Sequence, residues 1–369
     1  MTTPIAELGR QLHELSRRRG GRIQLMEVCG THTVGVFRSG IRTLLPEQVR
    51  LVSGPGCPVC VTAQRHIDAA IELAARDGVI LATYGDMMRV PGRRGSLERL
   101  RAEGAQIRVV NSARGALELA HSNPTQTVVF LGVGFETTAP ATAATVLEAD
   151  GEGIANFCVL MCHKLVVPAM QALLNAGDVP LDGFLAPGHV SVIIGANAYR
   201  PIAAKHQRPV VVAGFEPEQI MKGLVALVRQ VVEGRAAVEN VYSGVVSDEG
   251  NRVALGLLER VFVVADTPWR ELGMIPLSGL ELAPAYRRFD ALERFGIELG
   301  EDEDHPLCRC GEVITGKAEP RECPAFARQC TPLSPIGPCM VSSEGTCAAW
   351  YKYSRDRGAS ASRRSEGAA

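Results

Sequence analysis

Short apolar runs alternate with helix-like segments between residues 22 and 215. The runs are rich in β-branched and aliphatic residues and end at glycine or polar turn formers, which is typical of buried strands in βαβ units. We predict eight strands, within the segments RIQLMEVC, VRLVSGPG, VILATYG, QIRVV, TVVFLGVG, NFCVLMCH, GFLAPGH and PVVVAGF. This alternation predicts an α/β fold with mostly parallel sheets.

The eight strands are expected to form two doubly wound parallel-sheet domains. Polar turn formers, HSNPTQ at residues 121–126, interrupt the pattern, so we place the domains at 22–120 and 121–215. A single eight-stranded barrel is the competing topology. It is less favoured because these segments are short for the roughly 250 residues that such a barrel needs.

The pattern changes after residue 215. The segment EQIMKGLVALVRQVVEG predicts a long amphipathic helix, and the mixed, proline-rich sequence that follows contains six cysteines. We expect a third, cysteine-rich α+β domain over residues 216–353, and a metal or cluster would supply the cohesion that its loops lack. Residues 1–21 are expected to form a helix, and the polar residues 354–369 a disordered tail.

Composition and charge exclude several classes of protein. Hydrophobic residues make up 46% of the 369 residues, enough for more than one core. The net charge of -1 favours neither nucleic acid nor a membrane surface as a partner. The N-terminus does not resemble a signal peptide, so we expect a cytoplasmic protein. Eleven cysteines in a reducing compartment then indicate metal binding or thiol chemistry rather than structural disulfides.

Most of the chemically unusual residues follow the carboxyl ends of predicted strands, where open parallel sheets bind their ligands. Glycine-rich loops that simply end strands are the alternative explanation for any one of them. We expect the whole set to converge between two domains, and it consists of Cys29, His32, Cys57, Cys60, Asp86, Glu136 and His189.

The motif Cys57-Pro-Val-Cys60 precedes a predicted helix. The partial positive charge of a helix N-terminus favours a thiolate, so we interpret the pair as a redox dithiol. Half of a zinc site and two structural thiols are the alternatives. For Cys158 and Cys162, which lie in an apolar run, we expect buried thiols that act as small hydrophobic residues.

The motif Cys29-Gly-Thr-His32 places a thiol and an imidazole three residues apart. Both side chains could face one metal ion such as iron, nickel or zinc, because sulfur and imidazole nitrogen suit these metals. Alternatively, His32 is a base that activates Cys29 as a nucleophile, or a structural histidine at a helix N-terminus.

The C-terminal cysteines are the stronger signal. Cys310, Cys323, Cys330 and Cys347 form the pattern C-x12-C-x6-C-x16-C, and Cys308 and Cys339 are alternates. These spacings do not match a zinc ribbon built from two CxxC motifs, so we favour a [4Fe–4S] cluster over structural zinc. His163 and Lys164 are interpreted as structural residues at the start of a loop.

The sequence resembles the HypD family of hydrogenase maturation factors. The matching segments lie between residues 26 and 353, and they are MEVCGTHT, GPGCPVC, TYGDMMRVPG, GFETTAP, PGHVS and CGEVITGKAEPRECPAFARQCTPLSPIGPCMVSSEGTCAAWYKY. The resemblance implies two α/β domains, a cluster-bearing third domain, and a scaffold for assembly of the Fe(CN)2CO unit of [NiFe]-hydrogenases.

The resemblance also implies roles for single residues. Cys29 would hold iron together with a small chaperone of the HypC type, HypE would deliver cyanide to that iron, and His32 would be a neighbour or second ligand. Cys57 and Cys60 would be redox thiols, and the C-terminal cysteines would bind the [4Fe–4S] cluster. A cluster-dependent thiol–disulfide oxidoreductase is the alternative function, and in that case Cys29 would be dispensable.

Overall fold

The computed structural model describes residues 4–354, and the chain divides into two compact units. Unit 1 contains residues 1–57, 170–249 and 307–369, and unit 2 contains residues 58–169 and 250–306. Each unit is built on its own parallel sheet, so the structure is α/β as expected. Within the described residues, no helix combines the length and the apolar character needed to cross a lipid bilayer.

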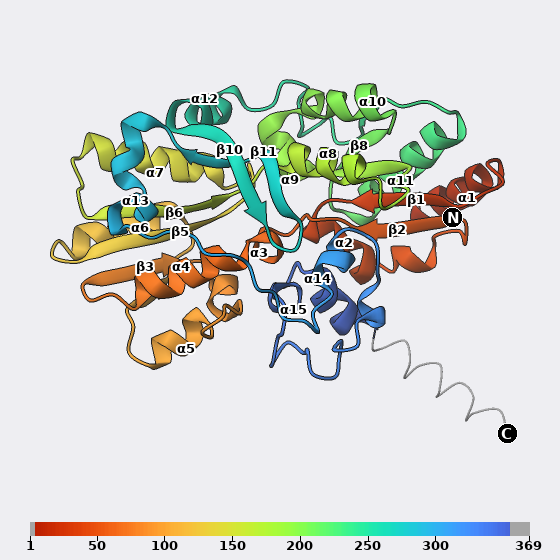
Figure 1. The fold of residues 1–369 in the computed structure, drawn as a ribbon. Helices are drawn as coiled ribbons and strands as arrows, with labels where there is room; N and C mark the ends of the chain where they lie inside the picture. The colour runs from red at the N-terminus through yellow and green to blue at the C-terminus, as the bar shows by residue number, and fades with distance from the viewer. Residues whose placement is uncertain (1–3, 355–369) are drawn as a thin grey trace. The chain divides into compact units, whose positions relative to one another are not determined.

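Unit 1 contains a five-stranded parallel sheet with the order β2-β1-β7-β8-β9. Its strands are β1 (Ile23–Glu27), β2 (Val49–Ser53), β7 (Gly183–Pro187), β8 (Val210–Ala213) and β9 (Val238–Asn240). Strands β1, β2 and β8 of this sheet are labelled in Figure 1. The central strands β1, β7 and β8 are buried along their whole length, which explains why their sequences are continuously apolar rather than alternating.

The helices of unit 1 come from all three of its chain segments. They are α1 (Pro4–Arg17), α2 (Gly30–Arg38), α9 (Gly188–Ile194), α10 (Arg200–His206), α11 (Pro217–Val232), α14 (Cys310–Ile314) and α15 (Pro338–Val341), with the 3-10 helices η1 (Ile41–Thr43), η3 (Ala196–Tyr199) and η5 (Pro320–Glu322). The long helix expected after residue 215 is α11, and the helix expected within residues 1–21 is α1. These two helices pack against each other, with Leu12 and Leu224 buried in one core.

Unit 2 contains a four-stranded parallel sheet with the order β4-β3-β5-β6 and an antiparallel pair, β10-β11. Its strands are β3 (Val79–Thr83), β4 (Ile107–Val109), β5 (Thr127–Gly134), β6 (Phe157–His163), β10 (Phe262–Trp269) and β11 (Gly273–Leu282). Its helices are α3 (Pro58–Val61), α4 (Gln64–Ala74), α5 (Leu97–Ala102), α6 (Ala113–Ser122), α7 (Ala139–Gly151), α12 (Arg252–Val261) and α13 (Ala291–Phe295), with η2 (Gly85–Arg89) and η4 (Pro284–Phe289). Helix α8 (Val166–Ala176) crosses the boundary between the units.

All eight predicted strands are present, as β1 to β8, but the structure assigns them to sheets differently from the expected domains 22–120 and 121–215. Strand β1 pairs with β7 rather than with β3, and β3 pairs with β5 across residues 121–126. The polar turn at 121–126 is a connection inside unit 2, where the Asn156 side chain donates hydrogen bonds to the carbonyls of Asn123 and Gln126.

The region expected to be a third domain, residues 216–353, is also divided. Residues 250–306 belong to unit 2, whereas the cysteine-rich segment after residue 307 belongs to unit 1. The reason is that this segment is mostly loop and packs on the first unit instead of forming a core of conventional size. The expected tail lies almost wholly outside the described residues.

Candidate functional site

Cys29 lies at the carboxyl end of β1, at the N-terminus of α2. Its backbone is extended, with φ -154° and ψ 124°, and its side chain is buried. The backbone of Gly56 passes so close that a Cβ there would lie 2.2 Å from the Cys29 nitrogen. Only glycine fits at residue 56, so the Cys29 loop packs directly against the residue that precedes Cys57.

The buried carboxyl group of Glu27 holds the Cys29 loop through hydrogen bonds. One oxygen of Glu27 accepts the backbone N–H of Cys29 at 3.1 Å, and the other accepts the Thr33 hydroxyl. Burial raises the pKa of the Glu27 carboxyl to about 7, although hydrogen bonds from Ser53 and Thr33 oppose the rise. The loop conformation therefore depends on a group that sequence reasoning did not single out.

The Cys29 thiol is held in its protonated form. Burial raises its pKa to about 12, and the carboxylates of Glu344 and Glu27 add to the rise. A cationic partner that replaces the proton would remove the penalty, because metal ligation deprotonates a thiol. This environment favours a metal ligand over a free nucleophile.

His32 lies in the first turn of α2 and is fully buried. Its Nε2 lies 3.0 Å from the carbonyl oxygen of Gly214, and since a carbonyl only accepts, Nε2 carries the proton. Burial lowers the pKa of the imidazole to about 4, so the ring is neutral. The other nitrogen, Nδ1, has no hydrogen-bond partner among the described residues.

His189 is the second residue of α9, which follows β7. Its ring stacks on Phe215 at 3.8 Å between centroids, and the His32 ring lies 4.6 Å from the same phenyl ring. His189 is exposed, in contrast to His32. The structure thus brings three of the expected site residues, Cys29, His32 and His189, to one edge of the sheet of unit 1.

Glu344 is a further residue of this site that the sequence analysis missed. Its carboxylate accepts the Thr31 hydroxyl at 2.7 Å, and a Cβ on Gly30 would lie 2.5 Å from the Glu344 Cβ. Glu344 lies between Cys339 and Cys347, so this contact joins the cysteine-rich segment to the Cys29 loop. No sequence pattern could indicate a contact between residues so distant in the chain.

Cys57 and Cys60 are joined in a disulfide bond and are both buried. Cys60 lies in α3, which is a single turn of helix, and the boundary between the units falls just after Cys57. The expected position at the start of a helix is confirmed. In this structure the pair is in its oxidised form.

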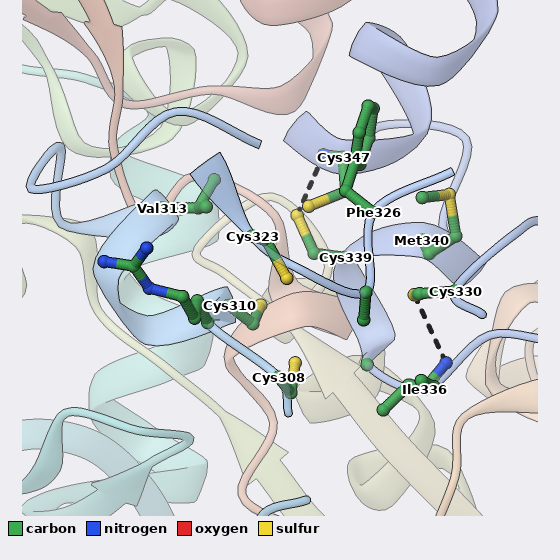
Figure 2. Close-up of a pocket in the computed structure, with 13 residues that line it drawn as sticks. Cys308, Cys310, Val313, Cys323, Phe326, Cys330, Ile336, Cys339, Met340 and Cys347 are labelled. Atoms are coloured by element: carbon green, nitrogen blue, oxygen red, sulfur yellow. Dashed lines mark hydrogen bonds between the residues drawn. The ribbon is translucent and has the colours of Figure 1, made fainter. Parts of the chain in front are cut away.

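The six C-terminal cysteines line a single pocket in unit 1, and Figure 2 shows Cys308, Cys310 and Cys323 pointing into the same space. The cavity has a volume of about 20 Å³, which is room for a single water molecule. Its other walls are mostly apolar, and no carboxylate lines it within the described residues. Backbone N–H groups point at two of the sulfur atoms, from Ile336 to Cys330 at 3.4 Å and from Cys347 to Cys339 at 3.2 Å.

The cysteine pocket contains both the four expected ligands and the two alternates, so the structure does not separate them. Among the described residues, no three side chains of histidine, cysteine, aspartate or glutamate are arranged to hold a single metal ion. The choice of four cysteines stays a prediction.

Besides Cys60, two expected site residues lie in unit 2. Asp86 is exposed in η2, after β3. Glu136 follows β5, is buried, and accepts the backbone N–H of Val166 at 3.0 Å, and burial raises the pKa of its carboxyl to about 7. Cys158 and Cys162 are buried in β6, as expected, and burial raises the pKa of both thiols to about 12.

Comparison with known proteins assigns the chain to a family. A family model described as "HypD: Hydrogenase formation hypA family" matches residues 4–354. The chain is 47% identical to the "Hydrogenase maturation factor HypD" of Escherichia coli (strain K12) over 350 residues, which cover 95% of this chain and 94% of the relative. It is 48% identical to the "Hydrogenase expression/formation protein HupD" of Azotobacter chroococcum mcd 1 over 341 residues, 90% of each chain. It is also 44% identical to the HypD of Rhodobacter capsulatus over 360 residues, 96% of each chain. The chain therefore belongs to the HypD family of hydrogenase maturation factors.

Proposed function

We propose that this chain is a cytoplasmic scaffold on which the Fe(CN)2CO unit of [NiFe]-hydrogenases is assembled. It holds iron together with a small chaperone of the HypC type and receives cyanide from HypE. Membership of the HypD family supports this proposal. The observation that carries it is that Cys29 and the six C-terminal cysteines belong to one unit, in which Glu344 joins the two sets.

Cys29 is the proposed ligand that this chain contributes to the iron, which is the cargo of the assembly. A thiolate is a soft ligand and donates electron density to the iron that cyanide and CO then bind. Because burial keeps the free thiol protonated, iron binding at Cys29 must release a proton. His32 is the proposed neighbour or second ligand, since its neutral ring keeps a lone pair on Nδ1.

The residues of the cysteine pocket fit a [4Fe–4S] cluster. Converging thiols, apolar walls and backbone N–H groups directed at sulfur are the surroundings that such clusters use. The proposed ligands are Cys310, Cys323, Cys330 and Cys347, with Cys308 and Cys339 as alternates. When bound, the cluster supplies one-electron transfer. The apolar side chains of Phe326 and Met340 line the pocket beside the thiols.

Cys57 and Cys60 are the proposed redox thiols, and their disulfide is the oxidised state of that couple. Asp86, Glu136 and His189 are the proposed binding residues around the cargo. The disulfide also suits the alternative function, a cluster-dependent thiol–disulfide oxidoreductase. In that case Cys29→Ala would keep its disulfide reductase turnover, whereas a scaffold would lose its iron.

Infrared spectroscopy of the protein purified together with its partner proteins tests the proposal, because metal-bound cyanide and CO absorb in a region free of protein bands. We expect these bands in the wild-type complex and none in the Cys29→Ala complex. Cys158→Ala, which removes a buried thiol of unit 2, is the matched control and should keep them. Full-strength bands in the Cys29→Ala complex would contradict the assignment of Cys29 as the iron ligand.

A further inference from the structure

Unit 2 contains a lysine that is almost completely buried. Lys164 follows β6 directly, its side chain is 1% exposed, and its Nζ donates to the carbonyl oxygen of Pro268 at 2.7 Å. Among the described residues, no carboxylate lies within ion-pair distance of this ammonium group. A buried charge with so few partners costs the fold stability, so its presence calls for a reason other than packing.

The groups around Lys164 compensate its charge only in part. The Nζ atom lies 5.4 Å from the ring centroid of Trp269. His66 and His163 are both buried, and burial, reinforced by the Lys164 charge, lowers the pKa of each imidazole to about 3. Both rings are neutral at physiological pH. Cys162 and Asp302 both favour the charged ammonium, but the carboxylate of Asp302 is already paired with Arg65 at 3.0 Å.

Lys164 is connected through the end of β10 to the helical turn that carries Cys60. The end of β10, which accepts the Lys164 hydrogen bond, runs beside the residues that follow Cys60: Trp269 forms an antiparallel bridge with Thr62. The backbone N–H of Arg270 donates to the carbonyl oxygen of Val61 at 2.9 Å. Pro268, Trp269 and Arg270 are consecutive residues, so the segment that accepts the Lys164 hydrogen bond also contacts the residues that follow Cys60.

We propose that Lys164 is a positioning residue for the Cys57/Cys60 couple. The positive charge of its ammonium group favours the reduced form of the couple over the disulfide. The inference rests on the proposed redox role of these cysteines. In the exchange, a dithiol reductant loses two electrons and two protons and becomes a disulfide, while the Cys57–Cys60 bond breaks. One of the two sulfur atoms takes up a proton and becomes a thiol, the other stays a thiolate, and the second proton passes to the solvent. The positive charge of Lys164 stabilises that thiolate and with it the reduced form of the couple.

The test is a redox titration of the full-length chain with mixtures of reduced and oxidised dithiothreitol. Alkylation and mass spectrometry then give the reduced fraction of the peptide that contains Cys57 and Cys60. Lys164→Met should require at least a tenfold higher ratio of reduced to oxidised dithiothreitol for half-reduction. Lys164→Arg, which keeps the charge, should titrate within about threefold of the wild type. Lys222→Met, which removes an exposed lysine of α11, should titrate as the wild type.

A thermal unfolding scan separates this role from a structural one. Removing a costly buried charge should leave the unfolding temperature of Lys164→Met unchanged or higher, even as the couple becomes harder to reduce. Lys164→Gln, which keeps a donor for Pro268 but no charge, should show the same redox shift. Failure of both neutral variants to fold would assign the lysine a structural role and overturn the proposal.

Two further outcomes would overturn it for different reasons. If the wild-type couple is reduced by dithiothreitol and Lys164→Met titrates identically, the lysine does not act on the couple, while the proposed redox function stands. If no mixture reduces the wild-type disulfide, the proposed redox role of Cys57 and Cys60 is wrong, and so is the proposed role of Lys164.

Discussion

The carboxyl ends of the two parallel sheets present different chemistry. In unit 1 this edge carries a thiol and two imidazoles, at Cys29, His32 and His189. In unit 2 the corresponding residues are a carboxyl group after β5, at Glu136, and an ammonium group after β6, at Lys164. One architecture thus places a thiol and two imidazoles at this edge in one unit, and a carboxyl group and an ammonium group in the other.

The two edges also differ in how their buried polar groups are compensated. Glu27 in unit 1 receives hydrogen bonds from the Cys29 backbone and from Thr33. Lys164 in unit 2 has one acceptor, the Pro268 carbonyl, and two neutral imidazoles near it. Lys164 thus gives unit 2 a buried positive charge, whereas the buried carboxyl group of Glu27 in unit 1 is satisfied by hydrogen bonds.

The first prediction tests whether the cluster ligands all lie in unit 1 and none in unit 2. Replacing each of the six C-terminal cysteines by serine, one at a time, should abolish the visible absorption of an iron–sulfur cluster in four variants. We expect those four to be Cys310, Cys323, Cys330 and Cys347, while the Cys308 and Cys339 variants keep it.

The controls for this scan are the buried thiols of unit 2. Cys158→Ala and Cys162→Ala should keep the absorption at full strength, because both side chains are enclosed in the apolar strand β6. Loss of the cluster from either control would show that the division of metal chemistry between the units is wrong.

The second prediction concerns the close packing of the Cys29 loop. In Gly56→Ala the new Cβ would meet the backbone of Val28 and Cys29, at 2.3 and 2.2 Å, and backbone cannot move aside as a flexible side chain can. We expect the free energy of unfolding to fall by about 2–3 kcal/mol, together with weaker iron binding, as measured by urea denaturation and metal analysis.

The matched control is Gly9→Ala, in the middle of α1. Nothing lies within 4 Å of the position that its Cβ would occupy. Because alanine is the better helix former, this change should stabilise the protein by about 0.5–1 kcal/mol. Equal effects of the two substitutions would mean that the approach of Gly56 to the Cys29 loop has no importance for stability.

Local pattern was enough to find the strands and the helices α1 and α11, because each of them buries a continuous or amphipathic apolar surface. It was not enough to assign strands to sheets. Parallel neighbours are joined by long crossovers, so β1 pairs with a strand that begins at Gly183. Turn residues such as Asn123 end a helix whether or not a domain also ends there, and here none does.

The same limit applies to the candidate site. Cysteines are recognisable from sequence because their chemistry resides in the residue type, and Cys29 and the C-terminal thiols were found in this way. Glu344 and Thr31 are ordinary surface residue types, and only the fold brings them together. Lys164 was interpreted as structural, since nothing in the sequence CHKLVV indicates that the ammonium group is buried without a carboxylate partner.

The last prediction uses pH to sharpen the contrast at Lys164. Burial lowers the pKa of its ammonium group from 10.5 to about 8 in the folded protein. Between pH 8 and pH 10 the unfolded chain therefore binds more protons at this residue than the native state does, so this lysine makes stability rise with pH, by roughly 2 kcal/mol over that range. Buried thiols with raised pKa values, such as Cys162, oppose the rise, because they lose protons first in the unfolded chain.

The quantity to measure is thus the difference in unfolding free energy between the wild type and Lys164→Met, obtained by urea denaturation under anaerobic conditions at both pH values. Met lacks the titrating group, so the unfolding free energy of the wild type should rise relative to that of the variant as the pH rises. A difference that stays constant from pH 8 to pH 10 would mean that Lys164 titrates as an ordinary exposed lysine and that the two sheet edges do not differ in buried charge.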